Sequence, residues 1–163
     1  RVLDEFLAFA RGAQEGEPEP EDPVALVSQV IEDFQRGQVP VTLALVEGEG
    51  QVALRAGGIR RAVENLVGNA TRYGTRAEVS VLITDKTLRI RVEDDGPGIP
   101  ADQREEAVKP FARLDPARNQ NTGTGVGLGL SIALDIARAH GGTLRLGESQ
   151  RLGGLLADIV IGR

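Results

Sequence analysis

The segment GTGVGLG, residues 123–129, places a glycine at every second position just before a predicted helix. Backbone N–H groups without neighbouring side chains can approach an anion closely, and the positive end of a helix favours negative charge. The spacing is not that of a Walker A loop, because no Gly-Lys-Ser/Thr follows, and it is not the GxGxxG dinucleotide fingerprint. The segment indicates a phosphate-binding loop, although a hinge or close helix-on-sheet packing would use the same glycines.

A second glycine-rich segment, DDGPG, follows directly on the predicted strand TLRIRVE. Asp94 therefore stands at the end of a strand, beside a backbone that the glycines turn sharply. A carboxylate in that place can accept a hydrogen bond from an exocyclic amine such as that of adenine. The alternative is a simple Asx-turn, since Asp-Gly pairs are common in turns.

Two amides, Asn65 and Asn69, lie four positions apart in a predicted helix and therefore on one face of it. A neutral oxygen ligand beside phosphates suits Mg²⁺, which takes one or two protein ligands and keeps several waters. Two solvated surface amides are the alternative. Tyr73, the only tyrosine, ends this helix and is either a core residue or a ring against a flat ligand.

The elements that must position these residues follow from hydrophobic periodicity and turn signals. Helices are predicted over residues 23–36, 58–73 and 130–140, and strands over 41–46, 51–54, 78–83, 87–93, 143–149 and 154–162. The 41–46 and 51–54 strands flank a Gly-rich turn, and residues 94–129 form a long, partly mobile loop. Strands and helices do not alternate strictly. We therefore expect an α/β two-layer sandwich, with helices on one face of a mixed sheet.

The chain has three parts by composition. Residues 1–12 carry an apolar helical stripe that is too short to be stable alone. Residues 13–22 contain five acids and two prolines, the composition of an extended linker, and residues 23–163 hold the predicted domain. Because the chain starts at Arg1 and has no Met, we expect it to be a piece of a longer protein.

Composition excludes several functions. The chain has no Cys and one His, which excludes disulfides, zinc fingers and multi-histidine metal sites. A net charge of -5 and only five Phe and Tyr residues argue against nucleic-acid binding. No apolar run is long enough to span a membrane.

Four motifs in order make the chain resemble the ATP-binding catalytic domain of two-component sensor histidine kinases, which have the Bergerat fold. They are an N-box (ENLVGNATRY, 64–73), a G1 box (DDGPG, 94–98), an F-box (KPFARLD, 109–115) and a G2 box (GTGVGLGL, 123–130). Their wording is similar to that of EnvZ-type osmosensor kinases. The resemblance covers residues 23–163, and implies a mixed, mostly antiparallel sheet of about five strands, three helices on one face and a long ATP lid.

The resemblance also implies roles for individual residues. Asn69 would be the Mg²⁺ ligand, with Asn65 beside it, and Arg113 would reach the γ-phosphate from the lid. Asp94 would accept the adenine amine. The residues placed around ATP are Asn69, Arg72, Tyr73, Asp94, Gly96, Gly98, Ile99, Phe111, Arg113, Leu114, Thr124, Gly125, Val126, Gly127, Leu128, Gly129 and Leu130. An extra Thr-Gly before the last glycines leaves open which of Thr122, Thr124 and Val126 contacts phosphate.

Position 65 distinguishes branches of the superfamily. At the position of Asn65, gyrase-like, chaperone-like and mismatch-repair ATPases and anti-sigma serine kinases have a Glu. That Glu serves as a base. Asn65 cannot take a proton, and Glu64 lies about 100° round the helix. The resemblance therefore implies a domain that holds Mg²⁺-ATP for a histidine on a separate dimeric helical hairpin, and hydrolyses it poorly alone.

The phosphoacceptor histidine is expected to lie outside this chain. His140 lies before two glycines at a helix end and lacks the acidic neighbour and Pro of a phosphoacceptor motif, so we interpret it as structural. Residues 1–12 would be the last turns of the hairpin. The implied partners are the parent homodimer and a response regulator. The domain would be cytoplasmic and its parent a bacterial inner-membrane protein. The alternatives are a regulatory nucleotide-binding module without turnover and an anti-sigma-type serine kinase.

Overall fold

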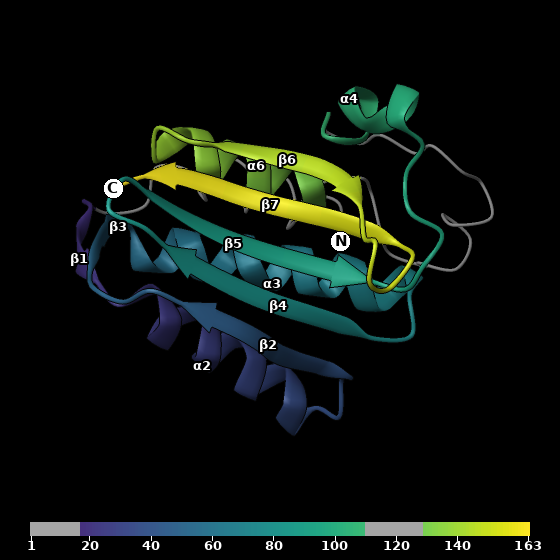
Figure 1. Cartoon of the computed structure of the whole chain (residues 1–163), viewed down its shortest axis with the longest axis horizontal. Helices are drawn as coiled ribbons and strands as arrows, with labels where there is room; N and C mark the ends of the chain where they lie inside the picture. The colour runs from purple at the N-terminus through teal and green to yellow at the C-terminus, as the bar shows by residue number, and fades with distance from the viewer. Residues whose placement is uncertain (1–16, 110–128) are drawn as a thin grey trace, which may run out of the picture.

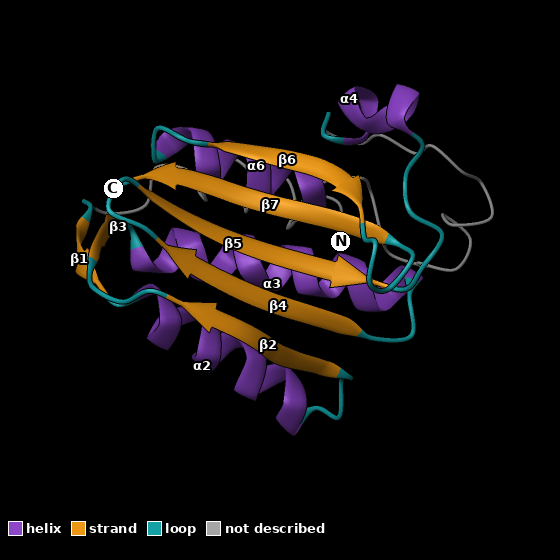
Figure 2. Ribbon diagram, in the orientation of Figure 1, coloured by secondary structure: helices purple, strands orange, loops and turns teal. Residues whose placement is uncertain are grey.

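Three helices cover one face of a five-stranded sheet and leave its other face toward the viewer in Figure 1. The computed structural model describes residues 17–109 and 129–163. The sheet has the strand order β2-β4-β5-β7-β6, and α2, α3 and α6 lie behind it (Figure 2). The expected two-layer α/β sandwich is confirmed.

The three covering helices are α2 (Pro23–Arg36), α3 (Ala56–Tyr73) and α6 (Gly129–Ala139). Asp22 caps α2, because its carboxylate accepts hydrogen bonds from the backbone N–H groups of Val24 and Ala25 at 3.0 and 3.3 Å. Each helix buries an apolar stripe, as its periodicity predicts. The observed bounds differ from the predicted ones by at most two residues, which is ordinary fraying of helix ends.

The sheet is mixed and mostly antiparallel. Its strands are β2 (Val41–Glu47), β4 (Ala77–Ile83), β5 (Thr87–Asp94), β6 (Thr143–Glu148) and β7 (Leu155–Gly162). The pair β2–β4 is parallel, and the pairs β4–β5, β5–β7 and β6–β7 are antiparallel. The chain between β2 and β4 contains α3, which returns it to the same end of the sheet as a parallel connection requires.

A second, two-stranded sheet lies beside the main one. Here β1 (Glu19–Glu21) pairs antiparallel with β3 (Val52–Leu54). The strands predicted on either side of the Gly-rich turn are therefore both present, but they belong to different sheets. The last residues of the predicted acidic linker form β1, so part of that segment is tied to the domain.

The core lies between the sheet and the helices. Alternate residues of the central strands, such as Val79, Ile90 and Ile159, are fully buried against Ile59 and Ala133 of the helices. This alternation sets the register of the sheet, because a slip by one residue would turn the apolar side chains to the opposite face. The core thereby fixes where β5 ends, and with it Asp94.

The predicted loop after Asp94 begins with two short helical turns, η1 (Ala101–Gln103) and α4 (Arg104–Ala107). Residues 1–16 and 110–128 lie outside the described residues. The predicted helical stub, most of the F-box and the first part of the G2 box are therefore not described. No helix within 17–109 or 129–163 is long and apolar enough to cross a membrane.

Candidate nucleotide-binding site

The helix α3 presents the predicted amide face at the edge of the core. Asn65 and Asn69 are partly buried, whereas Glu64, which precedes Asn65 in the helix, is exposed. The Asn65 side-chain amide donates a hydrogen bond of 2.8 Å to the carbonyl of Arg61, one turn earlier in the helix. This hydrogen bond fixes the orientation of the side-chain amide.

Asp94 ends β5 and is held by backbone groups. Its side chain is buried, with the residue 3% exposed. The oxygen Oδ1 accepts hydrogen bonds from the backbone N–H of Gly96 at 2.9 Å and of Leu155 at 3.0 Å. Two amide donors on one oxygen fix the plane of the carboxylate, so the group is oriented before any ligand arrives.

The end of α3 and the G1 turn are in backbone contact. A Cβ added at Gly96 would lie 2.9 Å from the carbonyl oxygen of Tyr73, and one at Gly74 would lie 3.0 Å from the amide nitrogen of Gly96. Only residues without a side chain permit this approach. The N-box (64–73) and the G1 box (94–98) are thus neighbours in space.

Asp95 strengthens the same contact. Its carboxylate accepts hydrogen bonds from the hydroxyl of Thr75, from the backbone N–H of Thr75 at 2.7 Å and from that of Arg76 at 3.2 Å. The hydrogen bonds from Thr75 lower the pKa of Asp95 below its ordinary value. Sequence reasoning assigned Asp95 no role. Its position directly after Asp94 was the available signal.

The start of α6 lies beside α3. A Cβ at Gly129 would lie 3.9 Å from the backbone oxygen of Asn65, and Leu130 is buried in the core. The last residues of the G2 box therefore meet the N-box helix. Within the described residues α3 thus contacts both other motifs: Asn65 lies beside Gly129, and Tyr73 contacts the turn after Asp94.

The G1 segment after Asp94 is connected to α4. Ile99 is buried, and Gly98 adopts the left-handed backbone that favours glycine, with φ of 70°. The Nε of Arg104 donates a hydrogen bond of 3.0 Å to the carbonyl of Ile99, which ties α4 to the G1 segment. Tyr73 is partly buried and Arg72 is exposed at the end of α3.

The remaining predicted site residues lie outside the described residues. They are Phe111, Arg113, Leu114, Thr122, Thr124, Gly125, Val126, Gly127 and Leu128. The roles given to them stay predictions.

His140 lies at the far end of α6, and both its ring nitrogens contact backbone groups. Nδ1 is 2.8 Å from the carbonyl of Ile136, and Nε2 accepts a hydrogen bond of 2.9 Å from the backbone N–H of Arg55. A carbonyl only accepts, so Nδ1 carries the proton and the ring is neutral. Burial lowers the pKa of His140 below the ordinary 6.5. The hydrogen bond to the carbonyl of Ile136 opposes this shift, and the positive charge of Arg55 adds to it.

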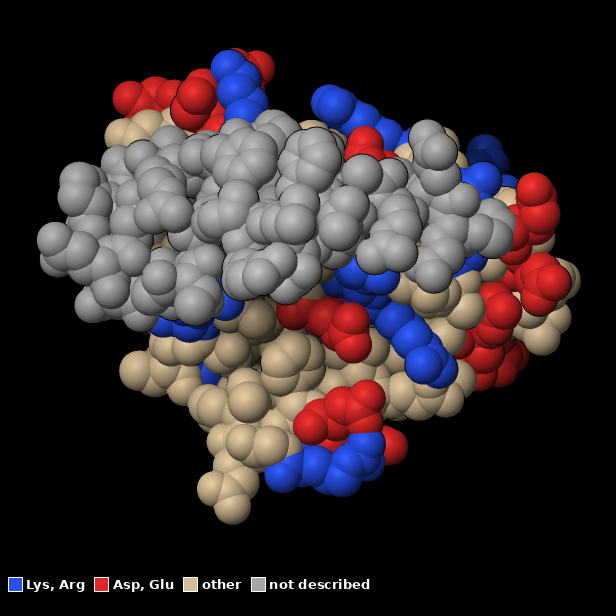
Figure 3. All heavy atoms as spheres, turned by 180° about the vertical axis from the view of Figure 1, so that it is seen from behind, with Lys and Arg blue, Asp and Glu red and all other residues tan. Residues whose placement is uncertain are grey.

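Charges of both signs are interspersed on the described part of the helix side of the molecule (Figure 3). No group of three or more His, Cys, Asp or Glu side chains within 17–109 and 129–163 is placed to hold a metal ion.

The fold and these contacts define a two-layer α/β sandwich in which α6 begins beside Asn65 of α3 and the turn after β5 contacts the end of α3. A family model described as histidine kinase-, DNA gyrase B- and HSP90-like ATPase matches residues 54–157. The chain belongs to this ATPase family.

The curated relatives are sensor histidine kinases. The chain is 39% identical to the sensor protein RstB of Escherichia coli strain K12 over 161 residues, which are 94% of the chain and 36% of RstB. It is 33% identical to the sensor-type histidine kinase PrrB of Mycobacterium leprae over 138 residues, which are 83% of the chain and 30% of PrrB. The chain thus spans about a third of the length of these relatives.

Solved structures agree with this assignment. The histidine kinase domain of the E. coli osmosensor EnvZ is 39% identical and has a TM-score of 0.68, with 91% of each chain covered. The mycobacterial sensor histidine kinase MprB is 27% identical with a TM-score of 0.72, covering 89% of this chain and 97% of that one. The resemblance to sensor histidine kinase catalytic domains is confirmed.

Proposed function

We propose that this chain is the catalytic part of a sensor histidine kinase, which binds Mg²⁺-ATP and transfers the γ-phosphoryl group to a histidine on a dimerisation domain. The observation that carries the proposal is the backbone contact between Tyr73 and Gly96. It brings an amide-bearing helix against a strand end whose Asp94 is already oriented. The family membership and the similarity to a sensor-type histidine kinase support the proposal.

Adenine and phosphates would bind at opposite ends of this site. Asp94 would accept the 6-amino group of adenine, with Ile99 and Tyr73 beside the ring. The triphosphate would extend toward Asn69 and the start of α6, where Gly129 leaves space and the helix presents its N–H groups.

The donor set fits a magnesium ion that arrives with the nucleotide. Asn69 offers an amide oxygen, and its side chain makes no hydrogen bond within the described residues. Mg²⁺ usually keeps several waters and is bound through one or two side chains together with substrate phosphates. When bound, it would neutralise charge on the phosphates.

The described residues offer positioning and not acid–base chemistry. Asn65 occupies the place of a base and is bound to the carbonyl of Arg61. A neutral imidazole attacks phosphorus without needing a strong base, so a domain of this kind depends on alignment of ATP with its acceptor. We expect slow hydrolysis by the isolated domain, with Arg113 completing the site from the lid.

The proposed partners follow from this chemistry. The acceptor would be a helical hairpin of the parent homodimer, to which residues 1–12 would belong, and a response regulator would receive the phosphoryl group. We infer that the domain works in the cytoplasm and that its parent is anchored in the inner membrane. The parent's phosphoacceptor hairpin, prepared separately, is the substrate to use.

The test is transfer of label from γ-³²P-ATP to that hairpin in the presence of the chain and Mg²⁺. We expect a labelled hairpin whose phosphate is lost in acid and retained in base, as a phosphoramidate is. Acid-stable label would indicate a serine kinase instead. ATP binding by calorimetry without any transfer would indicate a regulatory nucleotide-binding module.

A further inference from the structure

A buried polar pair lies behind the G1 turn, outside the residues assigned to ATP. The hydroxyl of Ser149 donates a hydrogen bond of 2.8 Å to the carboxylate of Glu93. Ser149 is 0% exposed and Glu93 is 4% exposed. Burying a serine and a glutamate is costly unless each is well bonded, so this pair requires an explanation.

Ser149 begins the turn of residues 149–154 that joins β6 to β7, and it organises that turn. Its backbone N–H donates to the carbonyl of Gly154 at 2.8 Å, and its carbonyl accepts from Gly153 at 2.8 Å. Its hydroxyl oxygen accepts from the backbone N–H of Leu152 at 3.0 Å. Every polar group of Ser149 is thus bonded to the turn or to Glu93.

The other end of the same turn contacts Asp94. The backbone N–H of Gly154 donates to the carbonyl of Asp94 at 3.0 Å, and the N–H of Leu155 donates to its carboxylate at 3.0 Å. A Cβ at Gly154 would overlap with both the carboxylate and the carbonyl of Asp94. The turn therefore lies in direct contact with Asp94 and sets the position of its side chain.

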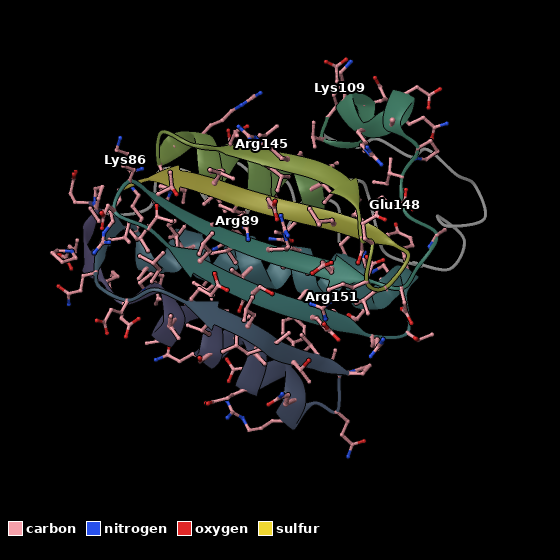
Figure 4. All side chains as sticks on the ribbon, viewed as in Figure 1. Lys86, Arg89, Lys109, Arg145, Glu148 and Arg151 are labelled. Carbon is pink, nitrogen blue, oxygen red and sulfur yellow. The ribbon has the colours of Figure 1, made fainter. Side chains whose placement is uncertain are left out.

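On the outer face of the sheet, an exposed arginine contacts the carboxylates of Glu78 and Glu93. Arg151, in the middle of the turn, lies near the start of β4 and the end of β5 (Figure 4). It forms an ion pair with Glu78 of β4, and its Nη1 lies 3.8 Å from the carboxylate of Glu93. Glu93 thus receives a hydrogen bond from the first residue of the turn and faces a cation from its middle.

We propose that Ser149 and Glu93 are positioning residues for base selectivity: they hold the 149–154 turn, and the turn fixes the Asp94 carboxylate to accept the 6-amino group of adenine. This inference rests on the proposed function, because it assigns adenine to Asp94. Glu93 and Asp94 are adjacent in β5 and lie on opposite sides of the strand. Glu93, on the outer face, anchors the turn through Ser149, and the turn orients Asp94, on the face toward the helices.

The experiment compares ATP with inosine triphosphate, in which a carbonyl replaces the 6-amino group. A carboxylate that is correctly oriented favours the amine and rejects the carbonyl. The affinities of both nucleotides are measured by calorimetry for the unaltered chain and for Ser149→Ala. We expect the ATP-to-ITP affinity ratio to fall about tenfold in the variant, the effect of about one misplaced hydrogen bond.

Two controls separate orientation from general loosening. Ser80→Ala removes another buried serine, in β4, which pairs with Arg91 three rungs away from Asp94, and should leave the ratio unchanged. Glu93→Gln keeps an acceptor for the Ser149 hydroxyl and should keep the ratio within about twofold, whereas Glu93→Ala should lower it as Ser149→Ala does. Glu93→Ala tests the same bond if Ser149→Ala does not fold.

The outcomes are distinct. If the unaltered chain binds neither nucleotide, the proposed function is wrong. If it binds ATP in preference to ITP and both Ser149→Ala and Glu93→Ala keep that ratio, the function stands and the positioning role is overturned. A fall in the ratio for Ser80→Ala of the same size would also overturn it, because any buried serine would then produce the effect.

Discussion

The backbone N–H of Arg55 donates a hydrogen bond of 2.9 Å to Nε2 of His140, 85 positions away in the sequence. Arg55 is the N-cap residue of α3 and has no side-chain capping bond, while its Nη1 donates to the carbonyl of Ala139 at 3.0 Å. Together these bonds join the beginning of α3 to the end of α6. They connect the two helices that carry the N-box and the end of the G2 box.

This bond predicts a pH dependence of stability. The pKa of His140 is lowered in the folded chain, chiefly by burial, so the unfolded chain takes up a proton first as the pH falls below 6.5. Folding stability is therefore complete above that pH and declines below it, by no more than about 1.4 kcal/mol per pH unit for one proton. Urea unfolding at pH 7.5 and 5.5 measures the decline.

The control for this prediction is simple because His140 is the only histidine. The variant His140→Gln has no group that titrates in this range at position 140, so its stability should change less between the two pH values. An equal change in both proteins would assign the effect to carboxylates elsewhere.

Replacement of Asn69 by Ala should abolish Mg²⁺-dependent ATP binding and leave the fold intact, because the residue is only partly buried and its amide makes no hydrogen bond within the described residues. Calorimetry with and without Mg²⁺ measures this. The matched variant is Glu64→Ala, an exposed position on the same helix, which should bind normally. Unchanged affinity in Asn69→Ala would remove the metal-ligand assignment.

Replacement of Asp94 by Ala should weaken ATP and ADP by similar factors, since both nucleotides present the same base. Loss of a charge-assisted hydrogen bond costs about 1.5–3 kcal/mol, which is roughly 10- to 150-fold in affinity. Titration of both nucleotides into the variant checks the factor for each. A loss confined to ATP would place Asp94 near the γ-phosphate and contradict its role.

The ion pair between Arg91 and Asp158 predicts an asymmetric effect on stability. Nε and Nη2 of Arg91 donate to the two carboxylate oxygens at 2.7 and 2.9 Å, and the hydrogen bond to Asp158 raises the pKa of Arg91. The Asp158 side chain is 10% exposed and that of Arg91 is 28% exposed. Removing the arginine therefore leaves the more deeply buried charge unpaired.

Arg91→Ala should accordingly lower the free energy of unfolding by about 1–2 kcal/mol more than Asp158→Ala does. The arginine that is left in Asp158→Ala can turn its charged end toward water. Urea midpoints of the two variants, measured at one pH, give the comparison. Equal losses would mean that the exposed Arg145, opposite Asp158 in β6, takes over the pairing.

Local elements were predicted well because their signals are local. The Asp-Pro pair marked the start of α2, and helical periodicity marked α3. The pairing of β2 with β4 was not predicted, because a parallel pair joins strands that are separated by a helix and has no local turn signal. Strand β1 was missed because its Glu-Pro-Glu sequence has low strand propensity, and its pairing with β3 decides its conformation.

The site divides in the same way. Asn65, Asn69 and Asp94 could be chosen from residue type and spacing, and their shared role in binding a nucleotide stays a prediction. Asp95 and Ser149 could not, because their roles depend on partners 20 and 56 positions away in the chain. Such contacts have no signature in a single sequence until the strands that bring them together are known.

The pairing of β1 with β3 has a consequence for how movement enters the domain. Strand β3 ends at Leu54, and the next residue is the N-cap of α3. A pull or twist applied upstream of Glu19 would therefore reach the base of the N-box helix across only three rungs of backbone ladder. The two-stranded sheet would therefore transmit a displacement of the preceding chain to the helix that carries Asn69.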